Sequence, residues 1–293
     1  MKLLDGKLLA DTIKAEIAKE VKEGFIDKGI PAPHIAAVLV GEDPASLTYV
    51  AGKEKACKEV GFTSSIYRYP ANISEKQLFE VIDFLNNDGE IDGFIVQLPL
   101  PIHIEEQKII ERINPLKDID GFHPSNVGRM SLNIPCYLPA TPYGIITLLE
   151  RNGIVTAGKH CVVLGRSHIV GTPISVLLSR KSKSGNATVT LCHSLTNDIA
   201  KYTSEADILI VAMGKCEFVT AEMVKKGAVV IDVGIHRVPS DETKSGFRLK
   251  GDVKFDEVAR KCSYITPVPG GVGPMTITSL LLNALKAARK EFK

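Results

Sequence analysis

Apolar and polar residues alternate along the first part of this chain in patterns typical of both helices and strands. One helix face is marked by apolar residues four positions apart: Leu9, Ile13, Ile17 and Val21. This spacing predicts an amphipathic helix that ends near Gly24. Apolar runs at residues 34–41, 64–69 and 93–96 predict strands, and helical patterns separate them.

Local capping signals mark two of these helices. Asp43 precedes a proline, which predicts a helix start and a helix over residues 44–60. Ser74 and Gln77 form a capping box that opens the next helix. Because helices alternate with strands, the first part of the chain is predicted to be an α/β domain.

The second part of the chain repeats the alternation. Residues 161–164 form an apolar run that Gly165 ends, and Gly171 then leads into a helix. Three further strands are predicted, at residues 186–192, 206–213 and 228–234. Strands separated by helices favour right-handed parallel crossovers, so this part is predicted to be a Rossmann-type, doubly wound parallel sheet.

The boundary between the two α/β domains is predicted near residue 140. Residues 1–140 then form the first domain, and residues 141–273 form the second. The apolar face of the C-terminal helix, residues 274–293, is expected to pack back on the first domain. Polar residues 237–252 predict a surface excursion with a short β-arm.

Composition narrows the class of protein. The net charge is +2 with mixed signs, so nucleic acid and acidic membranes are not expected partners. We expect neither a signal peptide nor a membrane span, since no run of eighteen apolar residues occurs. The six cysteines show no Cys-x-x-Cys spacing, which favours buried, reduced thiols in the cytoplasm and no metal site.

The turn after residues 161–164 is a candidate dinucleotide site. Glycines at a strand-to-helix turn let backbone N–H groups approach a pyrophosphate, although an ordinary turn has the same pattern. The second strand ends at His193-Ser194 instead of at the carboxylate that binds the ribose of NAD. Arg166 is able to bind a 2′-phosphate, so NADP is favoured over NAD.

Polar residues in the first domain are candidates for catalysis. Tyr49 and Lys53 share one helix face, where a partly desolvated lysine serves as a base or polarises a substrate. The same spacing also occurs on solvated helix edges. Gln97 lies at the carboxyl end of a predicted strand, just before two prolines. Its side chain either binds a ligand or hydrogen-bonds to the backbone of its own loop.

Two glycine-containing turns leave similar choices open. Asp118 and Asp120 precede Gly121, and they either bind a planar, guanidine-like ring edge or cap the turn. Residues 270–273, Gly-Gly-Val-Gly, lie at a helix start and either contact a ring or phosphate or serve only as a cap.

Taken together, these motifs resemble one known family over essentially the whole chain. They are Tyr49-Val-Ala-Gly-Lys53, Val96-Gln-Leu-Pro-Leu-Pro101, Lys117-Asp-Ile-Asp-Gly121, Gly165-Arg-Ser167 with Val170-Gly-Thr-Pro173, and Ile265-Thr-Pro-Val-Pro-Gly-Gly-Val-Gly-Pro-Met-Thr276. The family is the bifunctional methylenetetrahydrofolate dehydrogenase/cyclohydrolases. The resemblance implies a folate-binding and an NADP-binding α/β domain with a cleft between them, and two reactions of one-carbon metabolism. These are NADP-dependent oxidation of 5,10-methylenetetrahydrofolate and hydrolysis of the methenyl product to 10-formyltetrahydrofolate.

The resemblance also implies roles for individual residues. Lys53 is expected to be the principal catalytic group, assisted by Tyr49 and Gln97, with Asp120 holding the pterin edge. The residues expected to line the folate site are Val96, Leu98, Pro269, Gly270, Gly271, Val272 and Gly273. Those expected to contact the cofactor are Gly165, Arg166, Ser167, Ser194 and Ile235. A cytoplasmic homodimer is implied as well.

Two other classes share parts of this pattern. A shikimate dehydrogenase-like enzyme also places a substrate domain before a nucleotide domain, but it needs no pterin. A non-catalytic NADPH-binding protein would retain the glycine turn, yet it would have no use for Lys53, Gln97 and Asp120. Short-chain dehydrogenases are disfavoured, because their tyrosine and lysine follow the glycine turn in sequence.

Overall fold

The computed structural model of the chain describes residues 1–243 and 246–292. The chain divides into two compact units, one made of residues 11–140 and 277 onward, the other of residues 1–10 and 141–276. Residues 244–245 of the predicted polar excursion, and residue 293 of the predicted last helix, lie outside the described residues. Each unit is α/β, as the sequence predicts.

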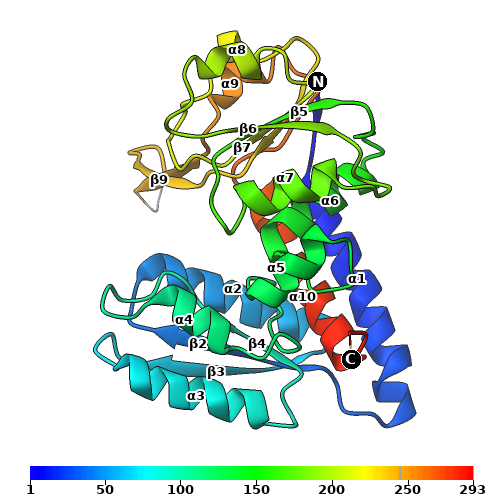
Figure 1. Cartoon of the computed structure of the whole chain (residues 1–293), viewed down its shortest axis with the longest axis vertical. Coiled ribbons are helices and arrows are strands. Elements are labelled where there is room, and N and C mark those ends of the chain that lie inside the picture. The colour runs from blue at the N-terminus through cyan, green and yellow to red at the C-terminus, as the bar shows by residue number, and fades with distance from the viewer. Residues whose placement is uncertain (244–245, 293) are drawn as a thin grey trace. The chain divides into compact units, whose positions relative to one another are not determined.

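The first unit contains a three-stranded parallel sheet in the order β3-β2-β4 (Figure 1). Its strands are β2 (His34–Val40), β3 (Thr63–Tyr69) and β4 (Gly93–Val96). Its helices are α2 (Pro44–Val60), α3 (Glu75–Asn87), α4 (Glu106–Arg112) and α5 (Pro124–Ser131), with a 3-10 turn η1 (Ile26–Lys28). Apolar residues of α3 and α4 form one buried cluster with β2 and β4.

The predicted caps in this unit are confirmed. The Asp43 carboxylate accepts a hydrogen bond from the Ser46 N–H at the start of α2, and Gly61 ends that helix with a φ of 80°. Ser74 and Gln77 form the reciprocal capping box of α3. Helix α5 is not predicted from the sequence, because its buried residues Asn126 and Met130 form no long apolar stripe.

The second unit contains a six-stranded parallel sheet in the order β1-β11-β8-β7-β5-β6. Its strands are β1 (Lys2–Leu3), β5 (His160–Leu164), β6 (Thr188–Cys192), β7 (Ile208–Val211), β8 (Val229–Asp232) and β11 (Tyr264–Ile265). An antiparallel hairpin of β9 (His236–Pro239) and β10 (Phe247–Lys250) is the predicted β-arm. The Rossmann-type parallel sheet is therefore confirmed.

Helices connect these strands. They are α6 (Ala140–Arg151), α7 (Gly171–Ser179), α8 (Ile199–Thr203) and α9 (Phe255–Val258), with a 3-10 turn η2 (Ala221–Met223). Two longer helices, α1 (Gly6–Gly24) and α10 (Val272–Ala288), have residues in both units.

Since β6 and β7 flank β5 on opposite sides, the strand order reverses at β5. Ligands of such sheets bind outside the carboxyl ends of the strands at this point.

The N-terminal residues belong to a different unit from the one predicted. Residues 1–10, which the sequence analysis assigned to the first domain, group with residues 141–276. The reason is that β1 pairs with β11, through Lys2 opposite Tyr264 and Leu3 opposite Ile265. A two-residue strand is too short to produce a periodic pattern, so sequence alone could not place it.

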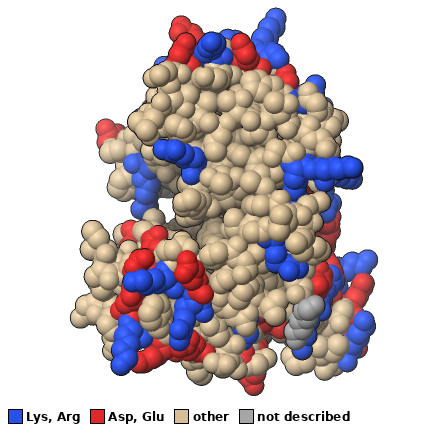
Figure 2. Space-filling view, in the orientation of Figure 1, with Lys and Arg blue, Asp and Glu red and all other residues tan. Residues whose placement is uncertain are grey.

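The distribution of charged side chains on the surface and the hydropathy of the helices agree with the composition of the chain. On the face shown in Figure 2, Lys and Arg side chains are interspersed with Asp and Glu. Within the described residues, no helix is long and apolar enough to cross a membrane. In the same part of the chain, no group of three or more His, Cys, Asp and Glu side chains is arranged to hold a metal ion.

Candidate active site

Lys53 and Gln97 form a polar pair in the first unit. Lys53 lies on α2 and is 9% exposed, and its Nζ donates a hydrogen bond of 3.2 Å to Oε1 of Gln97. The Gln97 backbone N–H donates to the Val38 carbonyl, and its side-chain Nε2 donates to the Leu98 carbonyl at 2.6 Å. These bonds fix the amide so that its oxygen faces the lysine. Lys53 therefore does not lie on a solvated helix edge, and Gln97 does more than satisfy its own loop.

Tyr49 lies one helical turn before Lys53 and is half-buried. Burial raises the pKa of the Tyr49 phenol, so the hydroxyl stays protonated at neutral pH. A neutral phenol donates or accepts one hydrogen bond without adding charge. Beside Lys53, it suits the orientation of a bound molecule better than proton abstraction.

The two aspartates of the 117–121 turn have different environments. Asp118 is 2% exposed, and its carboxylate accepts hydrogen bonds from the backbone N–H groups of Gly121 and His123 and from Asn126 Nδ2. It therefore holds the turn together. Asp120 remains partly exposed; desolvation raises the pKa of its carboxyl group, while the Lys53 charge opposes that shift. Of the two, Asp120 is the one whose carboxylate is available to a ligand.

Asn283 is a positioning residue that no sequence pattern indicates. It lies on α10, is fully buried, and its Nδ2 donates to the carbonyl oxygens of Ile119 at 2.9 Å and Leu138 at 2.8 Å. The same segments meet at Gly121, whose φ is +75° and where an added Cβ would overlap the Leu138 backbone. The C-terminal helix thus fixes the turn that carries Asp120.

The remaining residues expected to line a folate site are divided between the units. Val96 is buried at the end of β4, and Leu98 is partly exposed just after it. Residues 269–273 belong to the other unit. There, an added Cβ on Gly271 would overlap the carbonyl oxygen of Pro267 and the Cβ of Thr266, whereas a Cβ on Gly273 would meet no atom within 4 Å in the described structure. Packing thus requires Gly271, but it leaves the space beside Gly273 open.

The turn between β5 and α7, the candidate dinucleotide loop, is closely packed at both of its glycines. Gly165 has a φ of +105°, and an added Cβ would overlap the carbonyl of Ala212 at the end of β7. A Cβ on Gly171 would in turn overlap the Gly165 backbone. Ser167 Oγ accepts a hydrogen bond of 3.1 Å from the N–H of Val170, just before the start of the helix. Both glycines are therefore required for the close approach of the loop to β7 and to the start of α7.

Arg166 and Ser194 follow neighbouring strands at the same edge of the sheet. Leu164 of β5 pairs with Cys192 of β6. Arg166 lies two residues after Leu164, and Ser194 lies two residues after Cys192. Both are exposed. The His193 imidazole is engaged in its own turn, where its Nδ1 accepts from the Leu195 N–H at 3.2 Å. This edge thus presents a guanidinium and a hydroxyl, which together suit a phosphorylated ribose.

Ile235 lies beyond the carboxyl end of β8 and is 48% exposed. The strand ends at Asp232, which is buried. Burial raises the pKa of the Asp232 carboxyl group to about 6, with the neighbouring Asp252 charge adding to the shift and three backbone N–H donors opposing it. The glycine turn, the guanidinium and the exposed apolar side chain are the features that a dinucleotide requires, and these residues fit NADP.

The fold and these groups define an α/β enzyme with a Rossmann-type nucleotide-binding unit and a separate unit that carries a buried lysine. The chain belongs to the tetrahydrofolate dehydrogenase/cyclohydrolase family. Residues 4–120 match its catalytic domain, and residues 139–292 match its NAD(P)-binding domain. Membership in this enzyme family excludes the shikimate dehydrogenase-like and non-catalytic alternatives.

Individual relatives agree with this assignment. The bifunctional protein FolD of Cytophaga hutchinsonii is 62% identical over 288 residues, which cover 98% of this chain and 99% of that protein. The FolD methylenetetrahydrofolate dehydrogenase/cyclohydrolase structure from Campylobacter jejuni is 46% identical, with a TM-score of 0.93 over the whole of both chains. The Trypanosoma brucei enzyme, solved with NADP and an inhibitor, is 36% identical with a TM-score of 0.92, covering 99% of this chain and 97% of that one.

Proposed function

We propose that this enzyme oxidises 5,10-methylenetetrahydrofolate with NADP and hydrolyses the resulting 5,10-methenyl compound to 10-formyltetrahydrofolate. The observation that carries the proposal is the buried Lys53, hydrogen-bonded to Gln97. A binding protein gains little from burying an ammonium group, because desolvation of a charge destabilises the folded state.

Hydrolysis of the methenyl compound requires proton transfer. Water adds to the cationic methenyl carbon and loses a proton as the new C–O bond forms. The C–N5 bond then breaks, N5 takes up the proton that the hydroxyl group gives up, and the formyl group stays on N10. Neutral Lys53 accepts that proton, whereas charged Lys53 polarises the ring; Gln97 Oε1 holds its Nζ in place in either role. Tyr49 orients the reacting group, and Asp120 binds the guanidine-like edge of the pterin with two parallel hydrogen bonds.

Oxidation requires positioning more than acid–base catalysis. When bound, NADP supplies the acceptor for a hydride from the one-carbon unit. The protein binds the folate and NADP and orients them. Alignment of the two reactants alone provides a large share of the rate enhancement of such a transfer. In the proposed arrangement Gly165 and Ser167 would hold the phosphates, Arg166 and Ser194 would hold the 2′-phosphate, and Ile235 would lie at the nicotinamide end. Val96, Leu98 and residues 269–273 contact the folate.

The proposal extends to the cellular context. We infer a cytoplasmic homodimer, and a supply of 10-formyl groups to purine biosynthesis. Size-exclusion chromatography with light scattering tests the dimer directly: a mass twice that of the 31.8 kDa chain is expected.

A single assay tests both activities. The purified protein is mixed with 5,10-methylenetetrahydrofolate and NADP, and samples are quenched in acid, which converts 10-formyl product to the methenyl form. The expected result is NADPH with little methenyl compound before acidification and much after it. Accumulation of methenyl compound before acidification would leave only the dehydrogenase, and no NADPH would refute the proposed function.

A further inference from the structure

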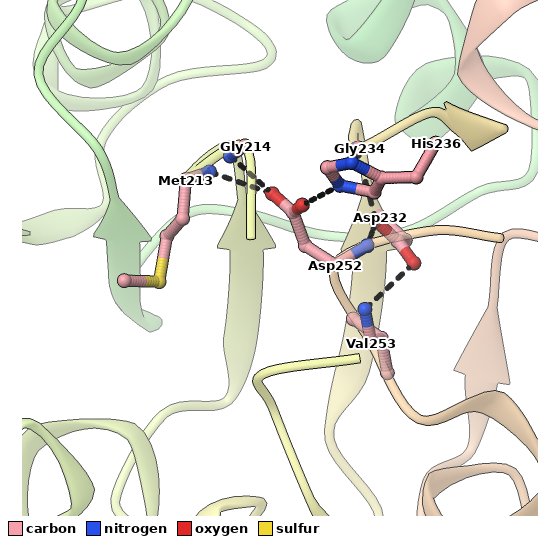
Figure 3. Close-up of polar contacts among 7 residues, drawn as sticks. All are labelled: Met213, Gly214, Asp232, Gly234, His236, Asp252 and Val253. Carbon is pink, nitrogen blue, oxygen red and sulfur yellow. Dashed lines mark hydrogen bonds and ion pairs between the residues drawn. The ribbon is translucent and has the colours of Figure 1, made fainter. Parts of the chain in front are cut away.

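A buried carboxylate joins two loops at the carboxyl edge of the six-stranded sheet (Figure 3). Asp252 is fully buried, and its Oδ2 accepts hydrogen bonds from the backbone N–H groups of Met213 at 2.7 Å and Gly214 at 2.9 Å. Its Oδ1 accepts from Nε2 of His236 at 2.7 Å. One side chain therefore connects the turn after β7 with the residue that opens β9.

A second carboxylate fixes the other side of this loop. Asp232 Oδ1 accepts from the N–H of Gly234 at 3.0 Å and from the N–H of Asp252 at 2.9 Å, while Oδ2 accepts from the N–H of Val253 at 3.0 Å. An added Cβ on Gly234 would overlap the Asp252 carboxylate. The loop, the two carboxylates and the strand end are thus closely packed and hydrogen-bonded to one another.

Ile235 lies between these two anchor points. The residue before it, Gly234, is bound through its N–H to Asp232, and the residue after it, His236, is bound through its ring to Asp252. Its own side chain is nevertheless 48% exposed. A half-exposed apolar side chain between two hydrogen-bonded residues offers a surface for one face of a planar ring.

The β7 turn is tied to the glycine loop as well. An added Cβ on Gly165 would overlap the carbonyl of Ala212, the residue before Met213. The loops that follow β5, β7 and β8 are therefore linked in series, from Gly165 through Met213 and Asp252 to Ile235. A change in the Asp252 contacts is therefore expected to move the 213–214 turn and residues 234–236.

We propose that His236 and Asp252 are positioning residues for the dinucleotide, and that the hydrogen bond between them holds Ile235 and the 213–214 turn in the conformation that binds NADP. The inference rests on the proposed function, because it takes Ile235 as a cofactor contact. Neither residue is required to touch the reacting atoms. The hydrogen bond between them affects the affinity for NADP. It does not affect hydrolysis of the methenyl compound, which uses Lys53 in the other unit.

The test compares two substitutions at one position. His236→Leu removes the hydrogen-bond donor, whereas His236→Gln keeps an N–H at nearly the same reach. Calorimetric titration with NADPH is expected to give a dissociation constant about tenfold higher for His236→Leu, and within about threefold of the parent for His236→Gln. The rate of methenyltetrahydrofolate hydrolysis, measured without nucleotide, is expected to stay within about twofold of the parent for both.

His160→Leu is the matched control. The His160 imidazole is also hydrogen-bonded, at 3.0 Å to Thr190, but it lies at the amino end of β5 in the same sheet. Its loss is expected to leave NADPH affinity unchanged. Unchanged affinity in His236→Leu, or an equal loss in His160→Leu, would overturn the positioning role alone. A parent protein that binds no NADPH would overturn both this role and the proposed cofactor.

Discussion

Nζ of Lys53 lies 3.2 Å from Oε1 of Gln97, although the two residues are 44 positions apart in the chain. Lys53 comes from the middle of α2, and Gln97 from the first position after β4. The adjacent backbone bonds of Gln97 keep its amide oxygen directed at the lysine. This pair predicts that cyclohydrolase activity depends on the amine of Lys53.

Lys53→Met is expected to reduce cyclohydrolase activity by about 10²–10⁴-fold, the usual contribution of one general acid or base. Because the glycine loop and Arg166 are unchanged, NADPH affinity is expected to remain at the parent value. Lys55→Met is the control, since the Lys55 side chain on the same helix is 80% exposed. Parallel loss of hydrolysis and NADPH binding in Lys53→Met would contradict the assignment.

Arg166→Ala tests the choice of cofactor. Removing a guanidinium that binds the 2′-phosphate is expected to raise KM for NADP about tenfold or more and to leave KM for NAD nearly unchanged. Steady-state rates with each nucleotide measure the ratio. Arg260→Ala removes another exposed arginine, one that follows α9 before β11, and should not change the preference. A similar rise in KM for both nucleotides would remove Arg166 from the 2′-phosphate site.

Asn283→Ala tests the connection between α10 and the 117–121 turn. The substitution leaves the buried carbonyls of Ile119 and Leu138 without their donor, which is expected to destabilise the folded protein by about 2 kcal/mol. Urea denaturation followed by circular dichroism measures the shift. Asn87→Ala, at an exposed position where Nδ2 donates to the Asp83 carbonyl of its own helix, is expected to cost far less. Equal stability of the two variants would contradict the proposed anchoring role.

The cysteines provide a test of the folded state. All six are free, and among them only Cys216 is exposed. Burial raises the pKa values of Cys57 and Cys161 to about 12, so at pH 8 these thiols stay protonated and unreactive. Titration with a thiol reagent is expected to modify one cysteine rapidly in native protein and all six in denaturant. Cys216→Ser should abolish the rapid phase; a rapid phase that persists would place another thiol at the surface.

The sequence by itself determined the features that depend on neighbouring residues. Strand and helix alternation is visible because burial imposes a period of two or 3.6 residues on each element. The caps at Asp43 and Ser74 are visible because each cap bonds to backbone three residues ahead. Gly165 was recognisable for a similar reason, since its positive φ is a local requirement of the turn.

Only the tertiary structure decided which polar residues act together. Asn283 contacts Ile119 across 164 positions, and Asp252 contacts Met213 across 39. No local pattern reports such pairs, because a buried asparagine or aspartate has the same sequence signature as one in a solvated turn. The same holds for β1, whose place in the sheet depends on its distant partner β11. Local chemistry thus specifies elements and turns, whereas long-range packing selects the side chains that position the site.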